Sequence, residues 1–219
     1  MNLGQLLHGK RRVDAPGAIG RARAYEALAT VAFAGRRRST YARVVALAGV
    51  TPGDRVLDVG CGTGFLTALA AEAARPGGCA VGVDVSEQMV EQARRLREVA
   101  GCTFRVGRAE ALDVADASFD VVVSSLAVHH IPEDLRAPAF AEVFRVLTPG
   151  GRVLIADFPP PRGHLARHLV GAVAGSAMRD NPVERIAPLL TDVGFAVDAV
   201  ERVGALLHCV RAVKPGGDA

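Results

Sequence analysis

The stretch Val56–Gly64, which reads VLDVGCGTG, constrains the fold of this chain most strongly. Residues 55–59 are apolar apart from Arg55 and Asp58, and two of them are β-branched valines, which is typical of a strand covered on both faces. Three glycines follow, and a residue without a Cβ lets the backbone turn tightly and lets a ligand approach it. Residues 63–74 predict a helix whose first N–H groups lack partners within the helix. The stretch therefore predicts a strand–turn–helix unit that can bind an anionic group.

The spacing of the glycines separates this turn from two other nucleotide-binding loops. Gly60, Gly62 and Gly64 form G-x-G-x-G, whereas dinucleotide-binding loops read G-x-G-x-x-G. The phosphate-binding pattern G-x-x-x-x-G-K-[ST] does not occur in the sequence, so we do not expect a nucleoside triphosphate. A glycine turn with a purely structural role is the alternative interpretation.

An acidic residue follows where a ribose-binding carboxylate is expected. Residues 80–85 predict a second strand, and Asp84 comes about 20 residues after the glycine turn, the usual distance in mononucleotide-binding βαβ units. A carboxylate can accept strong hydrogen bonds from two hydroxyl groups. Ser86 then predicts an N-cap for an amphipathic helix that extends to about Val99. An ordinary aspartate at a strand end is the alternative.

Length and composition favour one α/β domain with an aliphatic core. The chain is 50% hydrophobic and lacks Trp, so the core is expected to be aliphatic. Its 219 residues are enough for one such domain and leave some residues for a cap. The four cysteines are scattered without a C-x-x-C pair, so we expect neither zinc nor disulfides and favour a reducing cytoplasm. We expect no signal peptide and no membrane-spanning segment, because the required apolar runs are missing.

Positive charge is concentrated near the N-terminus. The net charge is +3, but residues 1–43 contain nine Lys or Arg residues against two acidic ones. Such a segment can attract nucleic acid or an anionic membrane surface. A solvated helical face, or a tail that neutralises a ligand carboxylate, is the interpretation we favour.

Turn signals divide the remaining chain into alternating helices and strands. Three turns end a helix and begin a strand: Thr51–Asp54, Arg75–Gly78 and Thr148–Gly151. Further strands are predicted at 103–107, 118–125 and 152–158, and a helix at 132–147. Such alternation indicates a parallel sheet with right-handed crossovers and helices on both faces. Strands at 195–203 and 206–213 are joined so closely that they predict a hairpin, so one strand runs antiparallel.

Two segments outside this alternation are expected to cover the site. Residues 1–49 predict an N-terminal arm and cap helices, with helices at about 21–34 and 39–48. The domain at 50–219 carries a predicted helical cap insert at about 159–193, which begins with a rigid run of three prolines.

From about Val50 to Phe158 the sequence resembles class I S-adenosylmethionine-dependent methyltransferases, and among them the ubiquinone/menaquinone-biosynthesis-type branch. Five ordered segments carry the resemblance: 56–67, 83–89, 107–112, 118–123 and 142–151. The resemblance implies a Rossmann-like, doubly wound α/β fold with a seven-stranded sheet, mostly parallel with one antiparallel strand, plus a helical cap. It implies S-adenosyl-L-methionine as cofactor and S-adenosyl-L-homocysteine as product.

The resemblance also implies a set of cofactor contacts. The three glycines would pass under the methionine part, and Asp58 would orient its amino group through water. Asp84 would hold the ribose, Met89 would lie against the adenine, and a tyrosine and a basic residue of the N-terminal cap would approach the carboxylate. The implied contacts are Tyr25, Arg36, Asp58, Gly60, Cys61, Gly62, Gly64, Asp84, Val85, Met89, Ala109, Glu110 and Ser124.

Candidate bases follow the fourth and fifth predicted strands. Methyl transfer from a sulfonium is an in-line displacement, for which the protein mainly aligns the reactants. An acceptor hydroxyl or carbon acid must also lose a proton, and ligands of open α/β sheets lie beyond the carboxyl ends of the strands. His129, His130 and Asp157 are therefore the catalytic candidates, with histidines that satisfy backbone groups as the alternative. His164 and His168 have helical spacing but no third ligand, so we expect no metal site.

The acceptor is expected to be a small molecule. Ser125 is followed by Leu126-Ala127 rather than by the Pro-Pro-aromatic loop of exocyclic-amine methyltransferases, and no cysteine follows a proline, as cytosine-C5 enzymes require. The apolar insert suggests a lipophilic, aromatic or quinone-like acceptor, with core packing as the alternative. The other candidate functions are a cofactor-binding regulatory or scaffolding protein without transferase activity, and an RNA or protein methyltransferase. The oligomeric state stays open, with a homodimer among the alternatives.

Overall fold

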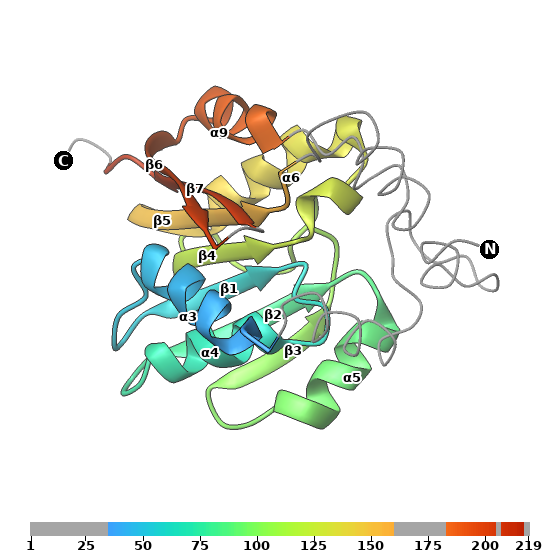
Figure 1. The fold of residues 1–219 in the computed structure, drawn as a ribbon. Helices are drawn as coiled ribbons and strands as arrows, with labels where there is room; N and C mark the ends of the chain where they lie inside the picture. Colours follow the sequence, from blue (N-terminus) through green and yellow to red (C-terminus); the bar gives the residue numbers. More distant parts are fainter. Residues whose placement is uncertain (1–34, 160–182, 205–206, 217–219) are drawn as a thin grey trace, which may run out of the picture.

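A seven-stranded sheet organises the part of the chain that the computed structural model describes, residues 35–159, 183–204 and 207–216. The strand order is β3-β2-β1-β4-β5-β7-β6 (Figure 1). The strands are β1 (Arg55–Val59), β2 (Cys79–Asp84), β3 (Cys102–Val106), β4 (Phe119–Ser125), β5 (Leu147–Asp157), β6 (Ala196–Val203) and β7 (Leu207–Val213). β7 pairs antiparallel with β5 and β6, whereas the other pairs are parallel. The predicted fold class and its single antiparallel strand are confirmed.

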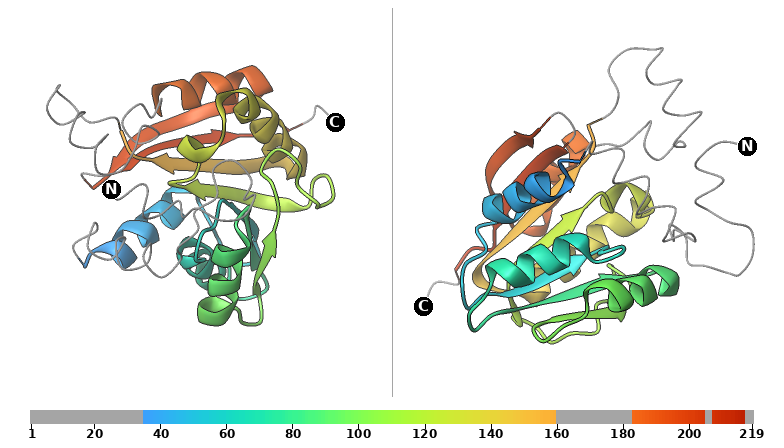
Figure 2. Two further views of the ribbon diagram at one scale, coloured as in Figure 1. Left: turned by 90° about the vertical axis from the view of Figure 1, so that its right-hand side faces the viewer. Right: turned by 60° about the horizontal axis from the view of Figure 1, so that its bottom comes forward.

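Helices cover both faces of the sheet (Figure 2). One face packs against α3 (Arg37–Leu47), α4 (Phe65–Ala73) and α5 (Glu87–Arg97), and the other packs against α6 (Glu133–Val146) and α9 (Ile186–Val193). Successive strand residues enter opposite core clusters: Val56 packs with the first group of helices and Leu57 with the second. Side chains alternate along a strand, so a strand buried on both faces has to be apolar throughout.

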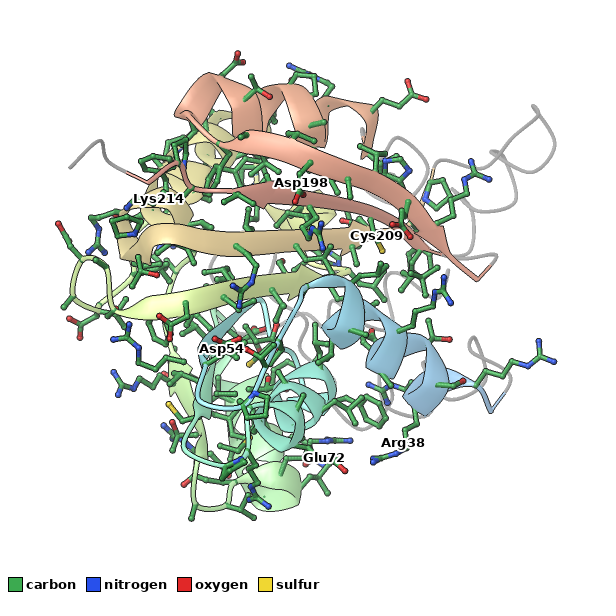
Figure 3. The ribbon with its side chains drawn as sticks, turned by 90° about the vertical axis from the view of Figure 1, so that its left-hand side faces the viewer. Arg38, Asp54, Glu72, Asp198, Cys209 and Lys214 are labelled. Atoms are coloured by element: carbon green, nitrogen blue, oxygen red, sulfur yellow. The ribbon has the colours of Figure 1, made fainter. Side chains whose placement is uncertain are left out.

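Polar contacts join elements that are distant in the sequence. Arg38 on α3 and Glu72 on α4 point toward one another (Figure 3), with Nη2 of Arg38 2.9 Å from Oε2 of Glu72. Lys214 donates from Nζ to the carbonyl oxygens of Phe144 and Leu147, at 2.9 and 2.7 Å. The two hydrogen bonds of Lys214 tie the segment after β7 to the end of α6, where helix carbonyls lack partners within the helix.

Several predicted element bounds differ from the structure, and two of the differences occur at turns. β1 begins and ends as predicted, but α4 begins at Phe65 because the glycine turn continues through Gly64, whose φ is +80°. β5 begins at Leu147, five residues before the predicted start, because Leu147 pairs with Phe119 of β4. The turn signal Thr148–Gly151 therefore lies within the strand rather than before it.

The predicted arm and insert are only partly covered by the described residues. Residues 1–34 and 160–182 lie outside them, so Tyr25, His164 and His168 have no described position. Residues 183–193 pack on the sheet: Val183, Ile186 and Leu190 are buried in the core cluster that contains α6. This part of the expected insert belongs to the regular helical layer, and the domain division otherwise stays a prediction.

Candidate active site

A cavity of about 840 Å³, its open mouth included, lies at the carboxyl ends of the central strands. The loops that follow β1, β2, β3 and β4 form its walls. This is the edge where ligands of open α/β sheets bind, at the point where the strand order reverses between β1 and β4. Val85, Met89, Ala109 and Glu110, which the resemblance implies as cofactor contacts, line the cavity.

The glycine turn and Asp84 form one hydrogen-bonded unit at this cavity. Gly60, Gly62 and Gly64 have φ angles of +75°, +53° and +80°. The N–H of Gly62 donates to Oδ2 of Asp84 at 2.8 Å, and the N–H of Ser86 donates to Oδ1 at 2.9 Å. Burial raises the pKa of Asp84, while these two backbone donors lower it. Asp84 thus lines the cavity as an oriented acceptor.

Gly60 and Gly64 each allow a different close approach. A Cβ on Gly60 would lie 2.3 Å from Cβ of Ala127, which follows β4. A Cβ on Gly64 would lie 2.4 Å from Cε1 of Phe104, because α4 packs closely against β3 there. Gly60 and Gly62 line the cavity, whereas Gly64 is required by core packing.

Asp58 lies beside a second, smaller cavity of about 280 Å³, its opening to solvent included. Its carboxylate is buried and accepts a hydrogen bond of 2.6 Å from Oγ1 of Thr67. Burial raises the pKa of Asp58 to about 7, partly offset by the Thr67 hydroxyl. Cys61 also lines this cavity, but its Sγ is in the core close to Gly82. A cationic ligand group in the smaller cavity would stabilise the ionised form of Asp58.

Arg37 and Tyr41, which the sequence analysis did not select, line the smaller cavity. Arg37 is 7% exposed, and its Cζ lies 4.1 Å from the centroid of the Phe65 ring. The predicted Arg36 is the exposed N-cap residue of α3. The helical spacing of Arg37 with the buried residues Tyr41 and Val44 was the signal that could have distinguished the two arginines.

Ser125, rather than the predicted Ser124, lines both cavities. Ser124 is 4% exposed and lines neither of them. The buried Oγ of Ser125 has no hydrogen-bond partner among the described residues. An unpaired buried hydroxyl is costly, so this atom marks a position where a polar ligand group fits. The one-residue difference follows from the alternation of side chains along β4.

The three catalytic candidates separate into one cavity residue and a buried pair. His130 lines the larger cavity, beside the apolar side chains of Leu126 and Ile131. His129 is buried, with its Nδ1 2.8 Å from Oδ1 of Asp157, which is fully buried at the end of β5. The ring centroids of His129 and His130 are 4.1 Å apart. Of the three candidates, only His130 lines the larger cavity.

Neither a metal cluster nor a membrane-spanning helix is found where the chain is described. No group of three or more His, Cys, Asp or Glu residues in residues 35–159, 183–204 and 207–216 is arranged to hold a metal ion. No helix in the same ranges is both long and apolar enough to cross a membrane.

The fold is Rossmann-like, and two cavities with different chemical groups lie at the carboxyl edge of its sheet. The larger cavity offers the Asp84 carboxylate and an apolar wall, and the smaller one offers Arg37 and Asp58. These groups fit the ribose, adenine, carboxylate and ammonium of S-adenosylmethionine, and the Ser125 hydroxyl lies where the two parts would join.

Comparison with known proteins agrees with this class. A family model described as a methyltransferase domain matches residues 56–151. A demethylmenaquinone methyltransferase of Renibacterium salmoninarum is 36% identical over 215 residues, which cover 88% of each chain. An arsenite methyltransferase of Halobacterium salinarum is 38% identical over 165 residues, which cover 71% of this chain and 40% of that protein. A TehB-like S-adenosylmethionine-dependent methyltransferase structure from Corynebacterium glutamicum has a TM-score of 0.66 at 20% identity, covering 88% of this chain and 97% of that one.

The chain belongs to the class I S-adenosylmethionine-dependent methyltransferases, as its sequence predicted. The cofactor of this family is S-adenosylmethionine. The chain spans about half the length of several curated relatives that it matches, and most of the length of the Renibacterium protein.

Proposed function

We propose that this protein transfers a methyl group from S-adenosylmethionine to a small acceptor with an apolar ring, such as a quinol or phenol. The observation that carries the proposal is the position of His130, which lines the larger cavity together with apolar side chains. The similarity to a demethylmenaquinone methyltransferase supports a quinone-like acceptor. The acceptor would lie against Leu126, Ile131 and Leu135.

In the proposed site the two ends of the cofactor are held by different elements. Asp84 accepts hydrogen bonds from the ribose, and Met89 and Ala109 flank the adenine. Arg37 pairs with the carboxylate in the smaller cavity, and Asp58 pairs with the ammonium. The cofactor supplies a methyl group on a positively charged sulfur, so little further activation of the donor is required.

His130 acts as the general base in this proposal. It accepts the proton of the acceptor O–H or acidic C–H while the resulting nucleophile forms a bond to the methyl carbon. The bound cofactor would supply the methyl group and would keep the electron pair of its methyl–sulfur bond as a neutral thioether. Asp157 holds His129 through Nδ1, and His129 in turn packs against the His130 ring. The buried pair therefore positions the base without touching the acceptor.

Arsenite is a less suitable acceptor than a ring compound. Trivalent arsenic prefers soft thiolate ligands, as soft metals do. Burial raises the pKa of Cys102 to about 11 and that of Cys209 to about 12, and it also raises the pKa of Cys61 well above its ordinary value. These thiols are protonated at neutral pH, and none of them lines the larger cavity. The relative that is named for arsenite therefore does not decide the acceptor of this chain.

The free thiols also favour the location that we propose, a reducing cytoplasm. The proposed partner is a small molecule rather than nucleic acid. The alternative functions are a cofactor-binding protein without transferase activity and an RNA or protein methyltransferase.

A radiolabelled methyl-transfer assay tests the proposal. The purified chain is given S-adenosylmethionine with a labelled methyl group, together with short-chain quinols, phenols, arsenite, tRNA or an acceptor-free control. We expect label in quinols or phenols and its loss in His130→Gln. Label in tRNA and in no small molecule would contradict the proposal and support the RNA methyltransferase alternative. Cofactor binding without transfer to any acceptor would favour the regulatory alternative.

A further inference from the structure

The cavity wall that follows β3 is a loop without a helix of its own. Residues 107–118 connect β3 to β4, and Gly107, Arg108, Ala109 and Glu110 line the larger cavity. The backbone hydrogen bonds between residues of this loop are short-range, such as that from the Ala111 N–H to the Arg108 carbonyl at 3.2 Å. Backbone bonds to other elements hold the two ends of the loop: the N–H of Gly107 donates to the Asp84 carbonyl at 3.0 Å, and the N–H of Ser118 donates to the Val146 carbonyl at 2.8 Å. The middle of the loop has little internal rigidity, so its position depends on side chains from other elements.

Two side chains of α6 bind residues 112–116, the half of this loop that leads to β4. Arg145 donates from Nη2 to the carbonyl oxygen of Leu112 and from Nη1 to that of Val114, both at 2.9 Å. Nη1 also lies 2.6 Å from Oδ1 of Asp116. Oε2 of Glu142 accepts from the N–H of Leu112 at 2.8 Å. Both the donor and the acceptor of the Leu112 backbone are thus held by α6.

The two α6 side chains also bind each other. Arg145 donates from Nε to Oε1 and from Nη2 to Oε2 of Glu142, at 2.7 and 2.8 Å. This bidentate pair fixes the plane of the guanidinium, and a planar guanidinium presents donors in several fixed directions. An ammonium group has no such fork, so lysine cannot span the same acceptors. The Leu112 side chain is buried in the core below, which anchors the loop at the same residue.

We propose that Arg145 and Glu142 are positioning residues for the cofactor, because they hold the loop that forms the wall at its adenine end. The inference rests on the proposed placement of the cofactor. Leu112 follows Glu110 by two residues, so a shift at Leu112 is transmitted to the residues that line the cavity. Arg145 and Glu142 line the opposite side of this loop and do not line the cavity.

The test compares cofactor binding in Arg145→Gln, Arg145→Lys and Glu142→Gln with the wild-type chain. We expect Kd for S-adenosylhomocysteine, measured by calorimetry, to rise about 10- to 100-fold in Arg145→Gln, as the loss of charge-assisted hydrogen bonds predicts. The KM for S-adenosylmethionine should rise in parallel, with kcat at saturating cofactor within about threefold of wild type. Arg145→Lys should recover only part of the affinity. Glu142→Gln should have the smaller effect, since an amide oxygen can still accept from Leu112.

Arg55→Gln is the matched control. Arg55 forms a bidentate pair with Asp120 at 2.9 and 3.0 Å at the amino end of β1, the opposite edge of the sheet. Arg55→Gln should lower the melting temperature as the Arg145 variants do, but it should leave the Kd for S-adenosylhomocysteine unchanged. Hydrogen exchange gives a second measurement: amides of residues 109–114 should exchange faster in Arg145→Gln and not in Arg55→Gln.

Equal Kd in wild type and a folded Arg145→Gln would overturn the inference. So would unchanged exchange at 109–114, or a loss of affinity in Arg55→Gln as large as that in Arg145→Gln. Failure of the proposed function is distinguishable, since there the wild-type chain itself would bind no cofactor or methylate no ring acceptor.

Discussion

The N–H of Gly62 donates a hydrogen bond to Oδ2 of Asp84, 2.8 Å away across the turns after β1 and β2. A second donor, the N–H of Ser86, holds Oδ1. The carboxylate is thus oriented by backbone groups alone, so a ligand need not restrict a free side chain. Its remaining lone pairs can accept two hydroxyl groups of a ribose.

Replacing Asp84 should weaken cofactor binding. Asp84→Ala removes a charged acceptor and should reduce the binding free energy of S-adenosylhomocysteine by about 1.5–3 kcal/mol. Calorimetry measures the effect, and circular dichroism should show a folded chain. Asp192→Ala, which changes an exposed carboxylate on α9, is the control. An unchanged Kd in Asp84→Ala would remove this residue from the site.

Replacing His130 should slow the reaction without weakening cofactor binding. His130→Ala should lower kcat about 10²- to 10⁴-fold, the usual contribution of a general base. Single-turnover rates and calorimetry on the same sample separate the two effects. If His130→Ala kept the wild-type rate from pH 6 to 9, alignment of the reactants alone would account for the catalysis.

His129→Ala should behave differently, because this ring is buried against Asp157. The substitution leaves a fully buried carboxylate without its 2.8 Å partner and should lower the free energy of unfolding by about 1–3 kcal/mol. Chemical denaturation measures this loss. A stable His129→Ala variant with full activity would show that the His129–Asp157 pair does not position His130.

Arg37 should select for the charged tail of the cofactor. Arg37→Gln should weaken binding of S-adenosylhomocysteine about tenfold or more, as for other charge-assisted hydrogen bonds. Binding of 5′-methylthioadenosine, which lacks the amino acid part, should be unchanged. Arg36→Gln is the matched control and should alter neither affinity, because Arg36 is exposed. A loss of affinity in Arg36→Gln alone would favour the original prediction.

Cofactor affinity should depend on pH through Asp58. Its pKa of about 7 in the folded chain exceeds the ordinary value of 3.8, so folding takes up a proton between these values. The free energy of unfolding should therefore fall as the pH rises from about 4 to 7. A cofactor ammonium favours the carboxylate, so affinity should rise over the upper part of this range, with proton release on binding. Calorimetry in buffers of different ionisation enthalpy measures that release, which Asp58→Asn should abolish.

The sequence by itself determined the fold class and the loops that carry the site. Apolar runs, glycine spacing and turn residues are local signals, and they placed β1 at its observed bounds and predicted the antiparallel hairpin strand. The glycine turn, Asp84 and the two histidines follow strand ends. In a parallel sheet these ends meet at one edge, so their proximity could be predicted without coordinates.

The tertiary structure decided which of two adjacent residues faces the cavities, although helical spacing offered a signal in the sequence for the two arginines. Arg37 rather than Arg36, and Ser125 rather than Ser124, line them, while His130 rather than His129 reaches the larger one. A shift of one residue in a helix or strand turns a side chain to another face. The composition of a segment does not indicate which face each of its residues occupies. The contact between Arg145 and Leu112 joins residues 33 positions apart. It exists because the fold brings α6 against the loop after β3, which no local pattern in either segment specifies.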